Sequence, residues 1–371
     1  MSSPAIELGI DSAAQWRPAL VDGFQMGPAR WDGQGVLSDV SVSGQQRILR
    51  IGLRERLIIE QIDGRRTVAD IRSALLDGGA DATSTHVSAS LNRMLAFGIL
   101  QRPFQLEPQG LRSLDAKATE SARNLRGVWA ANHDGGPLRN VLGQLAKWPV
   151  FTTAVVLALG IVILAVGAVP NAIRTIAVGA DGWSVTGAVL IALIWNVTVT
   201  LLHEVAHVGT FRALSAREAR VSITRLGVVP LLNTQLDGIG LLPPAQKLRV
   251  VASGPLLSLI ALAAPLALFA TTPSGTFWHL VAAVALVVDA LVVSLSLSFF
   301  PNTDGTRILE AISSVDQLQA VAFRTLFGTI RLPRALPAVT RTVVRVYPVL
   351  LVATVIAVLL AGVFTTVVAL G

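Results

Sequence analysis

Five long apolar stretches dominate the second part of the chain. Each holds about 20 residues with few charges, which is the length that an α-helix needs to cross a bilayer. They lie at roughly 150–169, 184–206, 250–270, 278–300 and 346–370. The pattern predicts a polytopic α-helical membrane protein with about five spans, whose two ends lie on opposite sides of the membrane.

The N-terminal part follows a different pattern, in which strand-like segments precede helical spacing. Residues 23–51 predict two strands with turns at Asp32-Gly33 and Ser43-Gly44. Three amphipathic helices are then expected at 52–61, about 68–77 and about 86–97. Asp63-Gly64 ends the first helix, Thr67 caps the second, and Ser84 or Thr85 caps the third. Two strands followed by three helices predict a winged-helix-like α+β domain.

Charged residues are concentrated ahead of the first apolar stretch. Of the 53 Asp, Glu, Lys and Arg residues, 32 fall in residues 1–148. We therefore divide the chain into an N-terminal domain at 1–105, a polar connector at 106–148 and a membrane domain at 149–371. The connector is expected to contain a helix at 112–129 and a break at Gly135-Gly136-Pro137.

The positions of Arg and Lys predict the orientation in the membrane. Segments 207–249 and 301–345 hold six basic residues each, whereas 170–183 holds Arg174 alone and 271–277 none. Basic loops stay in the cytoplasm, so the N-terminal domain is expected there. The first thirty residues lack a basic start followed by an apolar core, so no cleavable signal peptide is expected. With 27 Arg and 3 Lys, we expect a multi-pass protein of a bacterial cytoplasmic (inner) membrane.

The residue inventory excludes several classes of site. With no Cys in the chain, disulfides, iron–sulfur clusters and Cys nucleophiles are excluded, and a metal must be held by His and carboxylates. None of the three Lys follows a Gly as in a Walker phosphate loop. The first 148 residues hold 17 basic and 15 acidic residues, a net charge of +2. This is far from the basic face that nucleic acid requires, so no nucleic-acid partner is expected.

An H-E-x-x-H motif, His203-Glu204-Val205-Ala206-His207, lies at the cytoplasmic end of the second apolar stretch. On a helix, two His four residues apart share a face and can bind one zinc ion, and Glu204 is placed to take a proton from water. Ionisable residues cost about 2.5–3.5 kcal/mol near the centre of a span and are retained there mainly for function. We therefore favour zinc ligation by His203 and His207 and catalysis by Glu204 over a chance match.

A tetrahedral zinc that keeps one water needs a third protein ligand. The other three His lie elsewhere: His86 in the N-terminal domain, His133 in the connector and His279 at the opposite membrane face. Asp304 follows the fourth apolar stretch on the same side as the motif, so a carboxylate is the better candidate. The alternative is that Asp304 only caps a helix that begins near Thr306.

The H-E-x-x-H motif and the Asp304-Gly305 pair resemble the motifs of the site-2 protease family of intramembrane zinc metalloproteases, over roughly residues 184–310. The resemblance implies that His203, His207 and Asp304 bind Zn²⁺ and that Glu204 is the general base.

Other parts of this region also bear on the resemblance. Ser253-Gly254-Pro255 is similar to the family's Ala-Gly-Pro element, whereas Thr303 stands where Leu or Pro is common and Ser296 where Asn is often found. Residues 220–224 alternate with period two and predict a strand. In similar proteases such a segment forms a hairpin that aligns an extended substrate, so a substrate strand is expected near 220–226. The alternative is a surface hairpin.

Two polar residues within the apolar stretches have no assigned role. Asn196 lies seven residues before His203, and an interhelical hydrogen bond is favoured over a role in orienting a ligand. Asp289 could line a water path to the zinc. It precedes Asp304 by about 22 Å along a straight helix. Neither is placed among the catalytic residues.

Residues 17–100 resemble a PqqD-like domain, the element that binds leader peptides in pathways that make natural products from ribosomal peptides. The most telling segment runs from Ile62 to Ile71, around Asp63-Gly64 and Thr67. The resemblance implies that a leader peptide adds as a strand near 23–30 and packs on the helix at 86–97. A DNA-binding or dimerising winged helix is the alternative.

The two resemblances together predict a peptidase that matures a ribosomally synthesised, post-translationally modified peptide, including daptide-like membrane-active peptides. The precursor peptide and the lipid bilayer are the expected partners, and zinc is the expected cofactor. Two alternatives are a site-2-type protease that cleaves a membrane-bound transcription regulator, and a non-catalytic peptide exporter or immunity protein.

Overall fold

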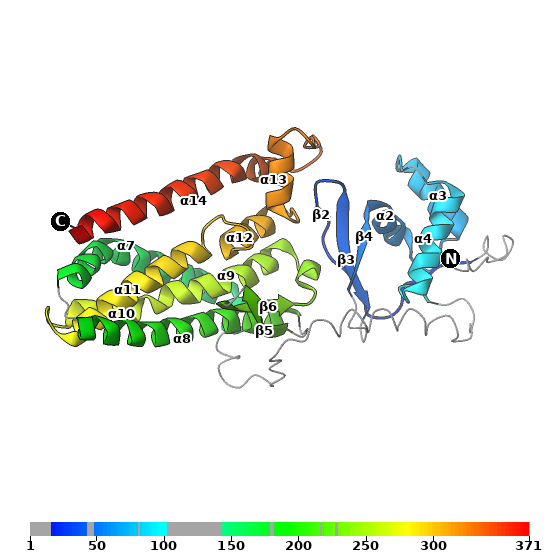
Figure 1. The fold of residues 1–371 in the computed structure, drawn as a ribbon. Coiled ribbons are helices and arrows are strands. Elements are labelled where there is room, and N and C mark those ends of the chain that lie inside the picture. The colour runs from blue at the N-terminus through cyan, green and yellow to red at the C-terminus, as the bar shows by residue number, and fades with distance from the viewer. Residues whose placement is uncertain are drawn as a thin grey trace. The chain divides into compact units, whose positions relative to one another are not determined.

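The computed structural model describes residues 16–42, 48–80, 82–101, 143–178, 182–215, 217, 219–226 and 229–370. The chain divides into two compact units, residues 1–126 and 127–371, and each is described by itself. The chain is mostly helical, with a small sheet near the N-terminus (Figure 1). The helix expected at 112–129, the break at 135–137 and the turn at Ser43-Gly44 lie outside the described residues.

The sheet of the first unit has four strands, so the expectation of two was wrong. They are β1 (Phe24–Met26), β2 (Arg30–Trp31), β3 (Val36–Val42) and β4 (Ile48–Gly52). β3 is the central strand: β1 and β2 pair in turn with one of its edges, and β4 pairs with the other, all antiparallel. The chain between β1 and β2 contains Pro28, which has no N–H to donate to a ladder, and this separates two strands where the pattern predicted one.

Three helices follow the sheet, as predicted: α2 (Leu53–Gln61), α3 (Val68–Asp77) and α4 (Ser84–Ala96). Thr67 caps α3 as expected, in a reciprocal capping box with Asp70. The cap of α4 is Thr83, whose hydroxyl accepts from His86 N at 3.3 Å, and not Ser84 or Thr85. Apolar side chains of the sheet and the helices form one core, which includes Val40, Ile58, Ile71, Leu91 and Met94.

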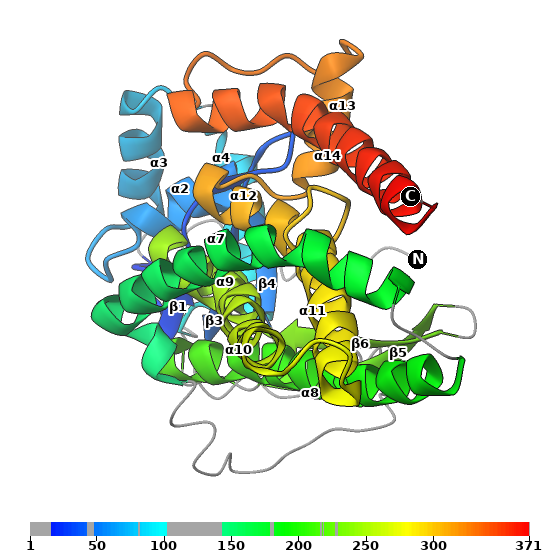
Figure 2. The same ribbon diagram turned by 90° about the vertical axis from the view of Figure 1, so that its left-hand side faces the viewer.

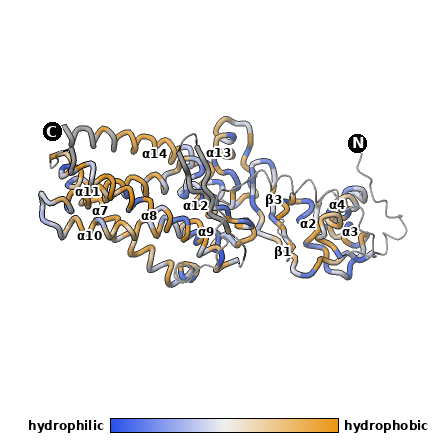
Figure 3. Tube along the Cα trace, turned by 60° about the horizontal axis from the view of Figure 1, so that its bottom comes forward, coloured by the Kyte–Doolittle hydropathy of each residue, from blue (hydrophilic) through white to orange (hydrophobic). Residues whose placement is uncertain are grey.

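The second unit contains five helices that are long and apolar enough to cross a membrane, at the positions that the hydropathy pattern predicted. Figure 3 shows these segments as the most hydrophobic part of the chain. They are α7 (Trp148–Val178), α8 (Gly182–Ser215), α9 (Pro244–Ala261) continued by α10 (Ala263–Thr271), α11 (Phe277–Ser296) and α14 (Ala338–Leu370). Large aliphatic side chains such as Ile163 and Ile194 are about 70% exposed, at 73% and 69%, which suits lipid rather than water as the surrounding medium.

Helix α11 is the most enclosed of these helices, because 56% of its most apolar segment is buried inside the protein. It packs against α7 and α8 through small and branched side chains, among them Ala172, Ala188, Ala283 and Leu286, and Figure 2 shows it between those two helices. The bundle therefore surrounds α11 with protein over most of its length. A polar side chain on the inner face of this helix, such as Asp289, is shielded from lipid.

Shorter elements connect the long helices. The predicted strand after α8 is present as β5 (Ala219–Leu226), which pairs antiparallel with β6 (Val229–Leu236). After α11 the chain turns into α12 (Asp304–Ser313) and then α13 (Leu318–Leu326). Two single-turn 3₁₀ helices, η2 (Gln144–Ala146) and η3 (Ile239–Leu241), precede α7 and α9.

Candidate metal centre

The two motif histidines lie on one face of α8, one turn apart. Their Nε2 atoms are 3.2 Å apart and their rings meet edge to face. Both side chains are buried, and Glu204, the next residue after His203, is half-buried. The helical spacing of the sequence thus turns two imidazole nitrogens toward one point, as predicted.

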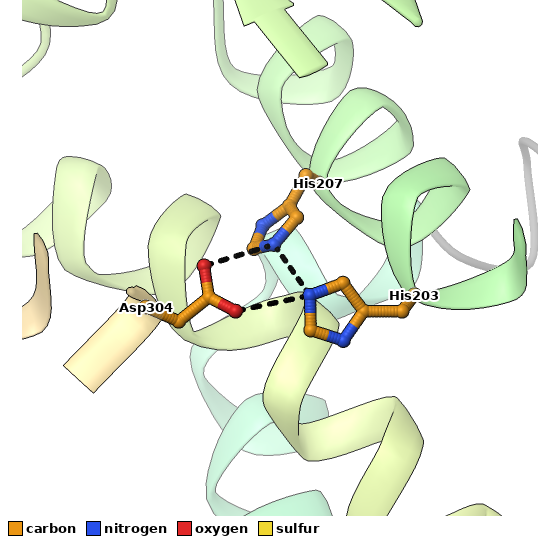
Figure 4. Close-up of side chains that lie close together, drawn as sticks. All are labelled: His203, His207 and Asp304. Atoms are coloured by element: carbon orange, nitrogen blue, oxygen red, sulfur yellow. Dashed lines mark hydrogen bonds and ion pairs between the residues drawn. The ribbon is translucent and has the colours of Figure 1, made fainter. Parts of the chain in front are cut away.

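Asp304 brings its carboxylate to the same point from α12 (Figure 4). Its Oδ2 lies 3.0 Å from His203 Nε2, and its Oδ1 lies 3.5 Å from His207 Nε2. Two ligand atoms at about 2.1 Å from a tetrahedral zinc are about 3.4 Å apart. The separations between the three residues match that geometry, so this donor set fits a zinc ion. These three residues would hold the ion, and a tetrahedral zinc takes one ligand more, so water or a carbonyl oxygen could supply the fourth.

The turn between α11 and α12 places Asp304 at the site. Thr303 is the N-cap of α12, so the alternative that Asp304 serves as the cap is wrong. Asp304 is the first residue of the helix, and its side chain is available for ligation. The next residue must be glycine, because a Cβ on Gly305 would lie 2.3 Å from the carbonyl oxygens of Leu297 and Ser298. In the Asp-Gly pair, Asp304 supplies the carboxylate and Gly305 allows the backbone to pass close to Leu297 and Ser298.

Each candidate ligand has a second hydrogen-bond partner that fixes its orientation. The Nδ1 atom of His203 lies 2.9 Å from Ser258 Oγ, and that of His207 lies 2.7 Å from Val250 O, both on α9. A carbonyl only accepts, so His207 donates from Nδ1, and Nε2 is left as the nitrogen that faces Asp304 and could bind a metal. Ser296 Oγ donates to Asp304 Oδ2 at 2.7 Å. Such outer partners orient metal ligands.

α9 approaches the histidines closely at Gly254, in the Ser253-Gly254-Pro255 element. A Cβ at this position would lie 2.4 Å from His207 Nε2 and 2.7 Å from His203 Nε2. Only a residue without a side chain leaves room for the two imidazoles. The sequence pointed to this element only through a resemblance, and the structure shows its physical role, which is to let α9 approach the two histidines.

The charge of Asp304 suits ligation. Burial raises the pKa of its carboxyl, but the hydrogen bonds and charges of His203 and His207 outweigh burial and hold the pKa well below its usual range. The carboxylate is therefore ionised, which is the form that binds a cation.

Glu204 faces the same cavity and accepts a hydrogen bond from Thr234 Oγ1 of β6. The sequence analysis did not single out Thr234 or Ser258, and it named Gly254 only within an element similar to one of the family's. Their types are ordinary in strands and membrane helices, and only their approach from other elements brings them there.

A cavity of about 420 Å³ adjoins the centre and extends between α8 and α11. Its walls include His203, Glu204, His207 and Asp304 at one end and Asn196 and Asp289 at the other. The estimate that put Asp289 about 22 Å from Asp304 assumed a straight helix and was wrong, because α11 ends at Ser296 and the chain turns back before α12. Both unassigned polar residues line the candidate site.

The other described histidines are not members of this group. His86 lies in α4 of the first unit, and His279 lies in the first turn of α11, where its ring stacks on Phe269 with 4.4 Å between ring centroids. His133 lies outside the described residues. Within the part of the chain that the structure describes, His203, His207 and Asp304 are the group whose ligand atoms converge.

Comparisons with protein-family models, with curated proteins and with solved structures yield no match.

Proposed function

We propose that this protein is a zinc-dependent intramembrane endopeptidase of the site-2 protease type. The observation that carries the proposal is the convergence of His203, His207 and Asp304 within 4.8 Å of one another, with Glu204 beside them on the same cavity. Binding a metal needs only the three ligands. Glu204 directly follows His203 but is not one of the three ligands. A carboxylate in this position supports hydrolysis rather than metal storage or a structural metal site.

The chemistry follows from the roles of these side chains. His203, His207 and Asp304 would hold the metal, which when bound supplies Lewis acidity toward a scissile carbonyl and toward water. Glu204 accepts a proton from the attacking water and returns it to the leaving amine. The hydroxyl of Thr234 hydrogen-bonds to Glu204 and keeps its carboxylate oriented toward the cavity.

A substrate at this site has to be extended. The peptide bonds of a helix are shielded by their own hydrogen bonds, and unpaired backbone groups are costly in a membrane. The β5–β6 hairpin contacts α8 beside the motif through β6, the strand that carries Thr234. A strand edge here offers the backbone partners that an unwound substrate needs.

The first unit is proposed to bind the substrate's leader segment. β1 and β2 lie along one outer edge of the sheet, which is the edge near residues 23–30 where strand addition was expected. Holding the leader on the same chain raises the local concentration of substrate at the membrane site. The proposed substrate is a ribosomally synthesised precursor peptide, and the proposed location is a bacterial cytoplasmic membrane with the first unit in the cytoplasm.

The experiment is peptide mass spectrometry with the full chain in membranes. The wild-type protein, the Glu204→Gln variant and a control variant, Asp237→Asn, are each incubated with the small peptide encoded nearest the gene. Asp237 is an exposed carboxylate in the turn after β6, so the control removes a charge without touching the cavity. Cleavage by wild type and control but not by Glu204→Gln is expected.

Three results would each contradict a different part of the proposal. Cleavage that persists in Glu204→Gln refutes the assigned general base. Leader binding without cleavage by any of the three proteins favours the carrier or immunity alternative. Cleavage of a membrane-bound regulator in place of the peptide would retain the chemistry and change the substrate.

A further inference from the structure

The end of the cavity opposite the metal centre carries a carboxylate that the proposed chemistry does not use. Asp289, on α11, is 2% exposed and lines the cavity together with Asn196 of α8. An ionisable side chain in a span costs about 2.5–3.5 kcal/mol. A packing role alone gives no reason to retain it.

The hydrogen bonds that Asp289 accepts come from neutral groups. Trp195 Nε1 donates to Oδ2 at 2.6 Å, and Asn196 Nδ2 donates to Oδ1 at 3.1 Å. Both donors are neutral, and among the described residues no Lys, Arg or His forms an ion pair with Asp289. A carboxylate accepts about four hydrogen bonds, so each oxygen retains capacity for another donor. The two helices thus fix the carboxylate in place without neutralising it.

Apolar side chains line the cavity between its two ends, and the polar residues there, Thr200 and Ser296, already donate their hydroxyls to Asn196 O and Asp304 Oδ2. Val199 on α8 and Val292 and Val293 on α11 lie between the metal centre and Asp289. An apolar passage that ends in a fixed carboxylate matches the shape of a long basic side chain, which has an aliphatic stem and a charged tip.

The length of the cavity limits which substrate residue can reach the carboxylate. Asn196 precedes His203 by seven residues, about 10 Å along a helix. An extended peptide advances about 3.3 Å per residue, so this distance corresponds to roughly three residues of substrate. The group bound at Asp289 therefore belongs to a residue within about three positions of the cleaved bond.

We propose that Asp289, Asn196 and Trp195 form a subsite that selects a substrate residue with an ammonium or guanidinium group close to the scissile bond. The inference rests on the proposed function, because it assumes that a peptide occupies the cavity. Asp289 binds the cation, and Trp195 and Asn196 are positioning residues that hold its two oxygens. A hydrogen bond to a charged group is worth a selectivity of roughly ten- to a hundredfold.

The test uses the full chain in lipid nanodiscs and apolar peptides of about 20 residues. The peptides are identical except at one position, which carries Lys, norleucine or Glu and is moved one residue at a time along the peptide. Binding is measured by fluorescence anisotropy with the Glu204→Gln variant, and cleavage is measured by mass spectrometry with the wild-type protein. The expected result is a Lys preference over norleucine of roughly ten- to a hundredfold, at one position.

Two variants assign the preference to the subsite. Asp289→Asn is expected to reduce the ratio of Lys to norleucine peptide binding to near one. Ser294→Ala changes a polar residue on the exposed side of the same helix and is expected to keep the ratio. The ratio reports selectivity, so a general loss of packing at α11 does not mimic the result. If Asp289→Asn does not fold, the three peptides are still compared on the protein with Asp289 intact, and equal binding at every position overturns the proposal.

The outcomes separate the subsite from the protease. Equal binding of the Lys and norleucine peptides at every position, or a preference that survives Asp289→Asn, overturns the subsite, whether or not cleavage occurs. A Lys preference that depends on Asp289, in the absence of any cleavage by wild type, supports the subsite and refutes the endopeptidase.

Discussion

Replacing Gly254 with Ala tests whether the two histidines and the close approach of α9 form one metal centre. The added Cβ would lie 2.4 Å from His207 Nε2 and 2.7 Å from His203 Nε2, whereas ordinary contacts between such atoms are about 3.5–4.0 Å. The imidazoles must therefore retreat by about 1 Å to restore ordinary contact. Metal–ligand distances tolerate only about 0.2 Å.

The effect should fall on metal binding rather than on folding. The atoms in the way are the far ends of two side chains that can rotate, and Ala is a better helix former than Gly by roughly 0.5–1 kcal/mol. We expect Gly254→Ala to fold with a melting temperature near that of wild type. Its zinc affinity should fall by at least about a hundredfold, the upper range for disturbing the surroundings of metal ligands.

The assay is zinc content by mass spectrometry and zinc affinity by chelator competition, both on the full chain in detergent, with thermal unfolding in parallel. Gly160→Ala is the matched control, because Gly160 lies inside α7 and a Cβ there would meet no atom within 4 Å. A Gly254→Ala protein that binds zinc as tightly as wild type would refute the geometry argued for this centre.

Three further substitutions test other parts of the second unit. Ser258→Ala removes the partner of His203 Nδ1 and should lower zinc affinity by about ten- to a hundredfold without unfolding the protein, as chelator competition would measure; an unchanged affinity would contradict an orienting role. Gly305→Ala drives a Cβ into two backbone carbonyls and should destabilise the unit by about 1–3 kcal/mol, seen as a lower melting temperature, whereas full stability would show that the α11–α12 turn can shift. Burial raises the pKa of Glu310, an effect that outweighs the hydrogen bond from Leu318 N and the charge of Lys247. Its pKa in the folded protein lies above the unfolded value of 4.5, so the folded form binds the proton more tightly. The stability of the protein therefore falls as the pH rises from 4.5 through the pKa of the folded form. Glu310→Gln should therefore raise the melting temperature more at pH 8 than at pH 4, and an equal effect at both pH values would exclude titration of this group as the cause.

The local patterns of the sequence were sufficient for most elements. The five apolar stretches, the helical positions of the first unit and the strand at 220–224 reappear as helices and as β5, because each depends on periodicity within a few turns of chain. The predictions of elements that were wrong concern where an element begins or ends. Pro28 separates β1 from β2, and Thr83 precedes the two residues expected to cap α4.

The candidate metal ligands were also predictable, because each carries its chemistry in its residue type. Two His four residues apart share a helix face by geometry alone, and the motif places a Glu directly after the first of them. Asp304 was reached by elimination among the few other groups able to bind a metal. The structure adds that its carboxylate and the two imidazoles lie within 4.8 Å of one another, close enough to hold one metal ion.

The contacts around the site could not be predicted, because they come from elements far apart in the chain; Gly254 was named only within a resemblance and Asp289 only as a possible part of a water path. Ser258 and Gly254 reach the histidines from α9, Thr234 reaches Glu204 from β6, and Asp289 joins the cavity because α11 ends at Ser296 and the chain turns back. Periodicity fixes which face of a helix a residue occupies, but not which helix packs on that face or where a turn reverses the chain. Thus the sequence by itself determined the helices and the candidate ligands. Only the tertiary structure decided how the ligands are held and which polar groups share their cavity, since those contacts depend on packing between distant segments.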